Sequence, residues 1–108
     1  MDGPAESGYS TRMVESGDRY AACVAAEAKK EVKNPAASEE IAGAAHARCW
    51  AAWQAYREAT NASFTAGANT REQLQYARDK ADAHLRQFEL ETRRNVMEGV
   101  VRSTLPGK

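Results

Sequence analysis

Three long stretches of this chain, residues 10–34, 38–60 and 71–103, place apolar residues at three- and four-residue steps. This spacing puts them on one face of an α-helix. The apolar faces comprise Met13, Gly17, Tyr20, Val24, Ala28 and Val32 in the first stretch, Ile41, Ala45, Cys49, Ala52, Trp53 and Tyr56 in the second, and Leu74, Ala77, Ala81, Leu85, Phe88, Thr92, Val96, Gly99 and Val100 in the third. The pattern predicts an all-α protein with three helices.

Local signals mark the helix ends. Asn34 precedes Pro35, and the residue before a proline is pushed out of the helical region, so we expect the first helix to stop there. Ser38, followed by two glutamates, is a typical cap for the second helix. Thr70 and Gln73 fit a capping box, which predicts that the third helix starts just after Thr70.

The length of 108 residues is typical of one domain. We expect a flexible leader at residues 1–9, a single helical domain at 10–104 and a tail at 105–108. The third helix is the longest, about 50 Å against about 37 Å for each of the other two. Its surplus length must overhang, bend or pair with something, and a second copy of the chain is one such partner.

The two cysteines lie almost symmetrically about the break after Asn34. Cys23 and Cys49 are each thirteen residues from Ala36, so a chain that reverses there brings them to the same height. Alanines surround both cysteines and permit the close approach of roughly 4.4 to 6.8 Å between Cα atoms that a disulfide needs. The sequence therefore predicts an antiparallel three-helix bundle with a long C-terminal helix and one interhelical disulfide.

The composition explains why a disulfide is useful. Leucine, isoleucine, valine and phenylalanine total thirteen residues, whereas alanine contributes twenty-two. Alanine favours helix but adds little volume to a core. In the chain-entropy model, closing a loop of this length stabilises the fold by roughly 3 kcal/mol. A thin helical core gains most from such a bond.

The charges and the apolar runs exclude two classes of partner. Fifteen basic residues balance fifteen acidic ones and are interspersed with them, whereas nucleic-acid binding needs a dense basic face. No run approaches the roughly 18 apolar residues of a membrane span, and the first residues do not form a signal peptide. Because disulfides persist in oxidising compartments, we expect a periplasmic or secreted protein whose export signal has been removed, with a cytoplasmic location as the alternative.

The candidate catalytic and metal-binding residues are few. Cys23, His46, Cys49 and His84 form a conceivable Cys2His2 set, but Cys23 lacks the second ligand on its own helix that zinc sites usually have. No nucleophile is tied by a motif to His46 or His84. We therefore expect no metal, no cofactor and no enzymatic activity.

The second helix carries more aromatic surface than one neighbouring helix can easily cover. Trp50 and Arg57 share one side of it, and Trp53 leans towards its apolar face. Either these aromatic residues fill the space between helices, or they form an interface patch of the kind enriched in tryptophan and arginine. The exposure of Trp50 distinguishes the two. Together with the apolar end of the third helix, the predicted partner-binding residues are Trp50, Trp53, Arg57, Met97 and Val101.

An alanine-rich helical hairpin with one distant cysteine pair resembles, in general style, small periplasmic or secreted bacterial proteins such as immunity proteins, adaptors and holding chaperones. The resemblance transfers no functional residue. We expect a non-enzymatic protein that binds a protein partner, as an inhibitor, immunity protein or adaptor. Two alternatives stay open. One is a carrier of a small apolar ligand or metal near His46, Trp53, Tyr56 and His84, and the other is a cytoplasmic protein that self-assembles through the third helix.

Overall fold

The computed structural model describes the backbone of residues 4–31 and 38–104 and the side chains of residues 8–31 and 38–99. Within these ranges the protein is a helical bundle without strands, as the apolar pattern predicts. Its helices are α1 (Pro4–Lys30), α2 (Ser38–Arg48), α3 (Trp50–Thr65) and α4 (Arg71–Thr104).

The first helix starts earlier than the sequence suggests. It begins at Pro4 rather than near Ser10, so it includes most of the segment expected to be a leader. Proline suits the first helical position, because its missing N–H group would have no partner there in any case. The helix ends at Lys30, and the expected stop at Asn34 lies outside the described residues, as does the predicted tail at 105–108.

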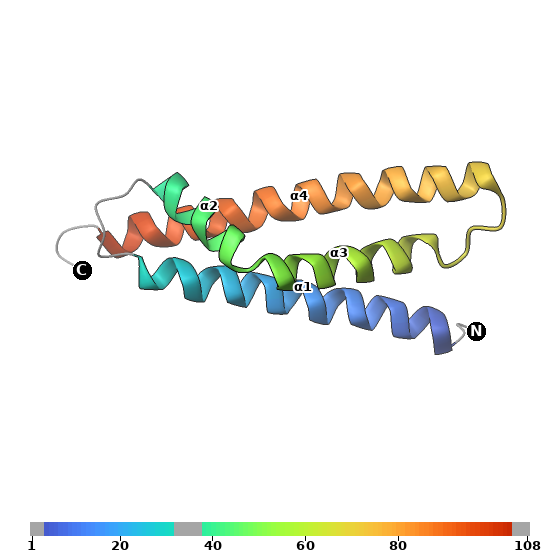
Figure 1. Ribbon diagram of the computed structural model, residues 1–108, viewed down its shortest axis with the longest axis horizontal. Coiled ribbons are helices and arrows are strands. Elements are labelled where there is room, and N and C mark those ends of the chain that lie inside the picture. Colours follow the sequence, from blue (N-terminus) through green and yellow to red (C-terminus); the bar gives the residue numbers. More distant parts are fainter. Residues whose placement is uncertain (1–3, 32–37, 105–108) are drawn as a thin grey trace.

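The second predicted helix is in fact two helices. The chain leaves helical geometry at Cys49, which has φ −101° and ψ 24°, and α3 then continues to Thr65. The N–H group of Cys49 is shared between the carbonyl oxygens of Ala45 and His46, each at 3.1 Å. Figure 1 shows that α2 is tilted away from the axis of α3. No proline or glycine stands at this break, so the local sequence does not predict it.

The start of α4 confirms the predicted cap in most of its detail. The N–H group of Gln73 donates to Thr70 Oγ1 at 3.1 Å. The side chain of Gln73 reaches back to the N–H group of Asn69, at 2.8 Å, rather than to that of Thr70. From this cap α4 runs for 34 residues along the length of a molecule that measures 55 × 25 × 22 Å (Figure 1).

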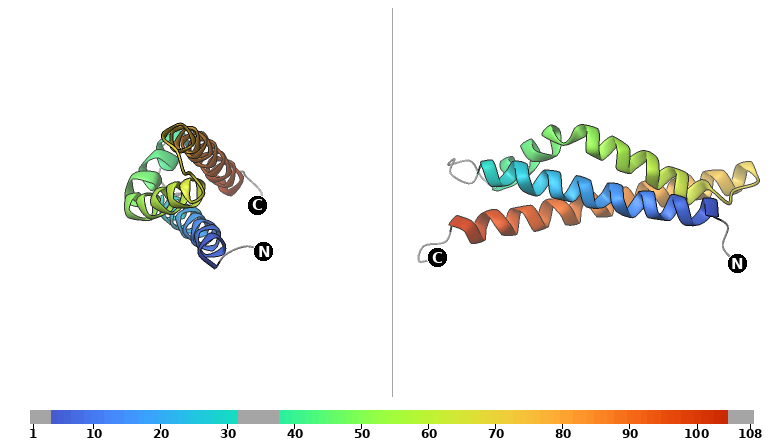
Figure 2. Two further views of the ribbon diagram at one scale, coloured as in Figure 1. Left: turned by 90° about the vertical axis from the view of Figure 1, so that its right-hand side faces the viewer. Right: turned by 90° about the horizontal axis from the view of Figure 1, so that it is seen from below.

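The helices are arranged as three corners of a rod. Helices α1 and α4 run in one direction, and α2 and α3 return in the other (Figure 1). Viewed end-on, α1, α4 and the α2–α3 segment surround a common axis (Figure 2). The most extensive helix contact is between α1 and α3, while α2 packs against both α1 and α4. The bundle therefore meets the prediction, with one corner divided between two helices.

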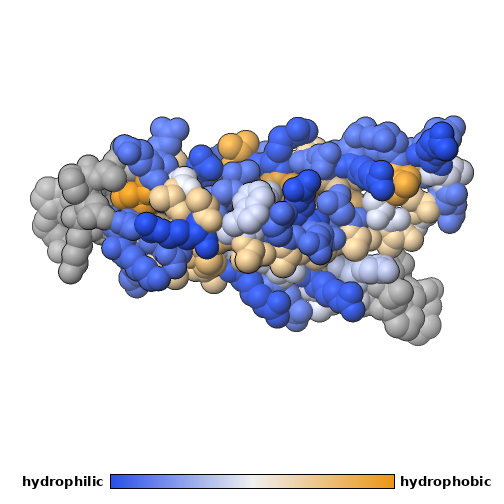
Figure 3. Space-filling view, viewed as in Figure 1, coloured by the Kyte–Doolittle hydropathy of each residue, from blue (hydrophilic) through white to orange (hydrophobic). Residues whose placement is uncertain are grey.

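Apart from Ala42, the core consists of residues from the predicted apolar faces. Small alanines alternate with aromatic rings, which supply the volume that the few leucine, isoleucine and valine side chains do not. The buried apolar residues are Tyr20, Val24, Ala28, Ile41, Ala42, Ala45, Cys49, Trp53, Tyr56, Ala81, Leu85 and Val96. On the face seen in Figure 3, hydrophilic residues are interspersed with small apolar patches.

The predicted disulfide between Cys23 and Cys49 is present, with 6.0 Å between the two Cα atoms. It joins α1 to the residue at which α2 ends and α3 begins. None of the helices in the described ranges combines the length and apolar character needed to cross a membrane.

Candidate functional site

The five predicted partner-binding residues fall into different environments. Trp50 is 49% exposed, and Arg57, two turns further along α3, is also exposed. Trp53 is only 8% exposed and belongs to the core. Met97 is partly buried against that core, and the side chain of Val101 lies outside the described residues. The structure thus leaves Trp50 and Arg57 as the exposed pair, which we call the Trp50 surface.

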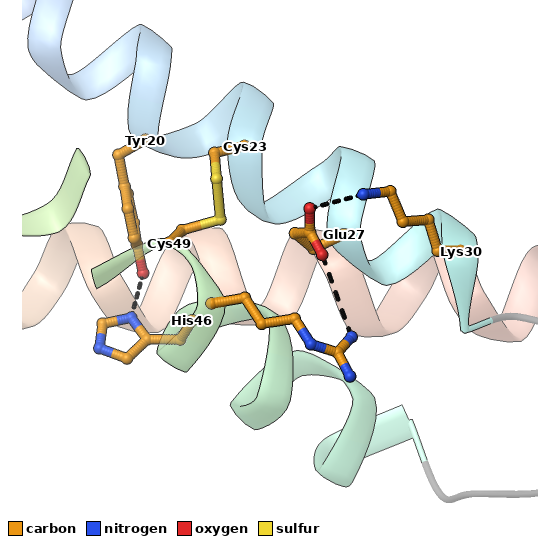
Figure 4. Close-up of a disulfide and its surroundings, with 7 residues drawn as sticks. Tyr20, Cys23, Glu27, Lys30, His46 and Cys49 are labelled. Carbon is orange, nitrogen blue, oxygen red and sulfur yellow. Dashed lines mark hydrogen bonds and ion pairs between the residues drawn. A yellow bond between two sulfur atoms is a disulfide. The ribbon is translucent and has the colours of Figure 1, made fainter. Parts of the chain in front are cut away.

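His46 connects the exposed Trp50 to the interior. Its ring lies edge-on to Trp50, with 6.0 Å between centroids, and 5.5 Å from the ring of Trp53. On the inner side, the Tyr20 hydroxyl and His46 Nδ1 are hydrogen-bonded at 2.5 Å (Figure 4). Tyr20 also packs against Trp53, at 4.9 Å between centroids. The exposed indole therefore stands against a ring that is held by a buried hydroxyl.

The other nitrogen of His46 faces an acidic residue. His46 Nε2 lies 3.8 Å from Glu89 Oε2, and the same carboxylate oxygen accepts a hydrogen bond from Arg93 Nη2 at 3.1 Å. Tyr20, His46 and Glu89 belong to α1, α2 and α4 respectively. A chain of polar contacts thus crosses the bundle, beginning at a buried hydroxyl and ending at partly exposed charges.

The Tyr20 hydroxyl in this chain stays protonated. The pKa of Tyr20 is raised to about 12, mainly by burial and also by the negative charge of Glu89, while Arg93 partly opposes the rise. The hydrogen bond of this hydroxyl joins it to His46 Nδ1, and the other ring nitrogen of His46, Nε2, faces Glu89. Because Tyr20 is only 1% exposed, this arrangement positions the histidine ring and does not present a nucleophile to a substrate.

A second tyrosine–histidine pair lies nearer the other end of the rod. The Tyr56 hydroxyl is 2.8 Å from His84 Nε2, and the Tyr56 ring packs on Phe88 at 4.5 Å between centroids. Burial raises the pKa of Tyr56. The ring of Phe64 also lies near His84, at 5.4 Å between centroids. These aromatic rings therefore pack against one another in the region where the carrier hypothesis places a ligand.

The conceivable metal set does not assemble. Cys23 and Cys49 are bonded to each other, and each histidine is hydrogen-bonded to a tyrosine. Among the described residues, no group of three or more histidine, cysteine, aspartate or glutamate side chains is placed to hold a metal ion.

Ion pairs flank the disulfide on the exposed side. Arg48 Nη1 lies 2.6 Å from Glu31 Oε1 and 4.0 Å from Glu27 Oε1. Lys30 Nζ donates to Glu27 Oε2 at 2.8 Å (Figure 4), and this hydrogen bond lowers the pKa of Glu27. These contacts tie the end of α2 to the end of α1, alongside the covalent bond.

A groove of about 420 Å3 lies between α1 and α3. Its charged side chains carry both signs, and its α3 side is made mainly of alanine. The lining residues are Tyr9, Arg12, Glu15, Ser16, Arg19, Ala55, Glu58, Ala59 and Ala62. The mixture of exposed charges gives the groove no preference for one ligand charge, so we do not place the functional site here.

Tyr20 and Glu89 are the residues of the Trp50 neighbourhood that sequence analysis missed. Tyr20 belongs to the predicted apolar face, but nothing in its position indicates that it pairs with His46. Glu89 is one of many charged residues on α4. No protein-family model matches this chain, and no curated protein and no solved structure matches it significantly.

Proposed function

We propose that this protein binds a protein partner through the Trp50 surface and catalyses no reaction. The observation that carries the proposal is the half-exposed indole of Trp50. Tryptophan is enriched among the residues that dominate binding energy at protein interfaces, as is arginine. Arg57 lies seven residues from Trp50 on the same helix, so both side chains extend from one side of α3.

The surroundings of Trp50 support binding without a large loss of side-chain freedom. Its ring stands edge-on to His46, and His46 is itself held by Tyr20 on one side and faces Glu89 on the other. A ring that is already positioned before binding loses less conformational entropy when a partner covers it. This is why the proposal centres on Trp50 and not on the other exposed apolar residues.

The proposed location is the periplasm or the extracellular space. The Cys23–Cys49 bond supports it, because disulfides persist in oxidising compartments and are rare in the cytosol. A small helical protein with an exposed tryptophan suits the role of an inhibitor, an immunity protein or an adaptor. Met97 and Val101, the other predicted contacts, carry no weight in this proposal.

The test compares two aromatic substitutions. The immobilised protein is used to capture its partner from the source cells, and the partner is then purified so that its affinity can be measured. We expect Trp50→Ala to weaken binding by about 2 kcal/mol or more, roughly thirtyfold, with little change in melting temperature. Tyr76→Ala removes a ring that is 65% exposed on α4 and serves as the matched control.

Unchanged affinity of Trp50→Ala for a partner that binds the wild-type protein would contradict the proposal. So would a large drop in melting temperature with intact binding, because Trp50 would then be a packing residue. A Tyr76→Ala variant that loses as much affinity as Trp50→Ala would place the interface elsewhere.

Self-assembly through α4 is a second candidate, favoured by a separate observation. Tyr76 and Leu90 are both largely exposed, and together with Ala83 they recur every seven residues, which places them on one face of α4. Light scattering tests this candidate: a particle with twice the chain mass of 11.8 kDa, reduced to a monomer by Leu90→Glu, would support it. A wild-type monomer at high concentration would reject it.

A further inference from the structure

The two sulfur atoms of the disulfide differ in their surroundings. Cys49 is only 2% exposed, because it lies in the core at the junction of α2 and α3. Cys23 is partly exposed on α1, and its neighbours Ala22 and Ala26 are small, exposed side chains. A thiol approaching from solvent therefore reaches Cys23 more readily than Cys49.

The two cysteines also differ in their position on the helices. Cys49 is the residue that precedes the first turn of α3, a helix of 16 residues. Among the described residues, no side chain caps this helix start, and no acidic residue lies in its first turn. The N–H groups there lack both a side-chain acceptor and a negative charge, although both stabilise helix starts. Cys23 does not lie at a helix start, because it is inside α1.

From these differences we infer that Cys23–Cys49 is an exchangeable disulfide with a fixed direction of attack. A dithiol reductant attacks Cys23 Sγ, and Cys49 Sγ leaves as a thiolate that caps α3. Thiolates are favoured at helix N-termini, and a better leaving thiolate speeds exchange. Burial of Cys49 destabilises its thiolate form, whereas the uncapped N–H groups of the first turn of α3 stabilise that form.

The exchange balances in two steps. The thiolate of the reductant forms a bond to Cys23 Sγ, the Cys23–Cys49 bond breaks, and its electron pair stays on Cys49 Sγ. The second thiol of the reductant loses its proton. It then attacks the reductant's first sulfur atom, which is bonded to Cys23 Sγ in the mixed disulfide. The electron pair then stays on Cys23 Sγ, which takes up a proton from water. The reductant has become a disulfide, and Cys23 and Cys49 have gained two electrons.

The protein is expected to stay folded after this reaction. The junction of α2 and α3 keeps the Tyr20–His46 hydrogen bond and the Arg48–Glu31 ion pair. Ile41 and its neighbours on α2 remain buried against α1 and α4. Reduction thus removes one bond at a place where several non-covalent contacts remain. The inference does not depend on the proposed partner binding.

The direct test uses the oxidised wild-type protein and a monothiol probe, glutathione. After a short reaction the mixture is acidified, free thiols are alkylated under denaturing conditions, and the modified cysteines are identified by mass spectrometry. We expect glutathione on Cys23 and the alkyl group on Cys49, with an excess on the order of tenfold over the reverse pattern. Equal labelling, glutathione mainly on Cys49, or no adduct at any thiol concentration would each overturn the inference.

A second measurement examines the thiolate itself. The variants Cys23→Ser and Cys49→Ser each retain one thiol, and ultraviolet absorbance of the thiolate gives its pKa in each variant. We expect the pKa of Cys49 to lie below that of Cys23. An equal or higher pKa of Cys49 would overturn the inference. Circular dichroism establishes that both variants are helical, and the glutathione experiment remains decisive if either one unfolds.

Discussion

Gly17 on α1 lies against the ring of Tyr56 on α3. A Cβ atom at position 17 would stand 2.9 Å from Tyr56 Cε1 and 3.3 Å from Cζ of Phe88. The Tyr56 ring has little room to retreat, because it packs on Phe88 and its hydroxyl binds His84. The missing side chain at position 17 is therefore what allows α1 and α3 to approach around an aromatic ring.

Gly17→Ala should consequently destabilise the protein. Forcing a methyl group into a packed core costs about 1 to 3 kcal/mol, which outweighs the gain of up to about 1 kcal/mol from replacing glycine in a helix. Gly43→Ala is the matched control and should raise stability, since a Cβ atom there meets nothing within 4 Å in the part of the chain that the structure describes. Urea unfolding measures both. An equal gain for the two variants would show that the Tyr56 ring moves aside freely.

Thr60 offers the opposite case, a substitution that should stabilise. Its side chain is fully buried, and its Oγ1 atom has no hydrogen-bond partner among the residues that the structure describes. Thr60→Val replaces the hydroxyl by a methyl group of similar size, so we expect a gain of about 1 kcal/mol in the free energy of unfolding. Thr65→Val is the control, because Thr65 Oγ1 donates to Asn61 O at 2.7 Å. Loss of stability in Thr60→Val would contradict this view.

The raised pKa of Tyr20 predicts a loss of stability in alkaline solution. The usual value is 10.0, and the folded protein holds it at about 12. Between these values the unfolded chain releases the proton and the folded chain keeps it, so stability is complete below pH 10 and falls as the pH rises to 12. Two pKa units correspond to about 2 to 3 kcal/mol.

Urea unfolding from pH 8 to 11.5 tests this prediction. Tyr20→Phe should be less stable than wild type by about 1 kcal/mol at pH 8, because His46 Nδ1 loses its hydrogen-bond partner. Its stability should also fall less steeply above pH 10, with a remaining slope from Tyr56, whose pKa is raised as well. Tyr76→Phe, at an exposed position, should follow the wild-type curve. An identical alkaline slope in Tyr20→Phe and wild type would refute the assignment.

Much of the fold could be predicted because its signals are local. The apolar faces depend on steps of three and four residues, and the cap at Thr70 depends on a side chain three residues away. The disulfide was predictable for a related reason, since two cysteines at equal distances from a chain reversal lie at equal heights. The break at Cys49 carries no local signal, and it coincides with the residue that is bonded to α1.

The site was only partly predictable. Sequence periodicity puts Trp53 on the apolar face and Trp50 at its edge, but it leaves open whether another helix covers Trp50. That depends on where α2 and α4 lie, and α2 departs from the line of α3 just before Trp50. The exposure of Trp50 could therefore be read only from the packed helices.

The amino-acid order by itself determined which faces are apolar, where α4 begins and which sulfurs can meet, because each depends on spacing along one helix or across one reversal. The pairing of Tyr20 with His46 was decided by tertiary structure alone. In a straight hairpin with Cys23 level with Cys49, Tyr20 would be level with Ala52, six residues or about 9 Å from His46. The tilt of α2 at Cys49 and the reach of the tyrosine side chain close that distance, and neither is encoded in the spacing of the residues.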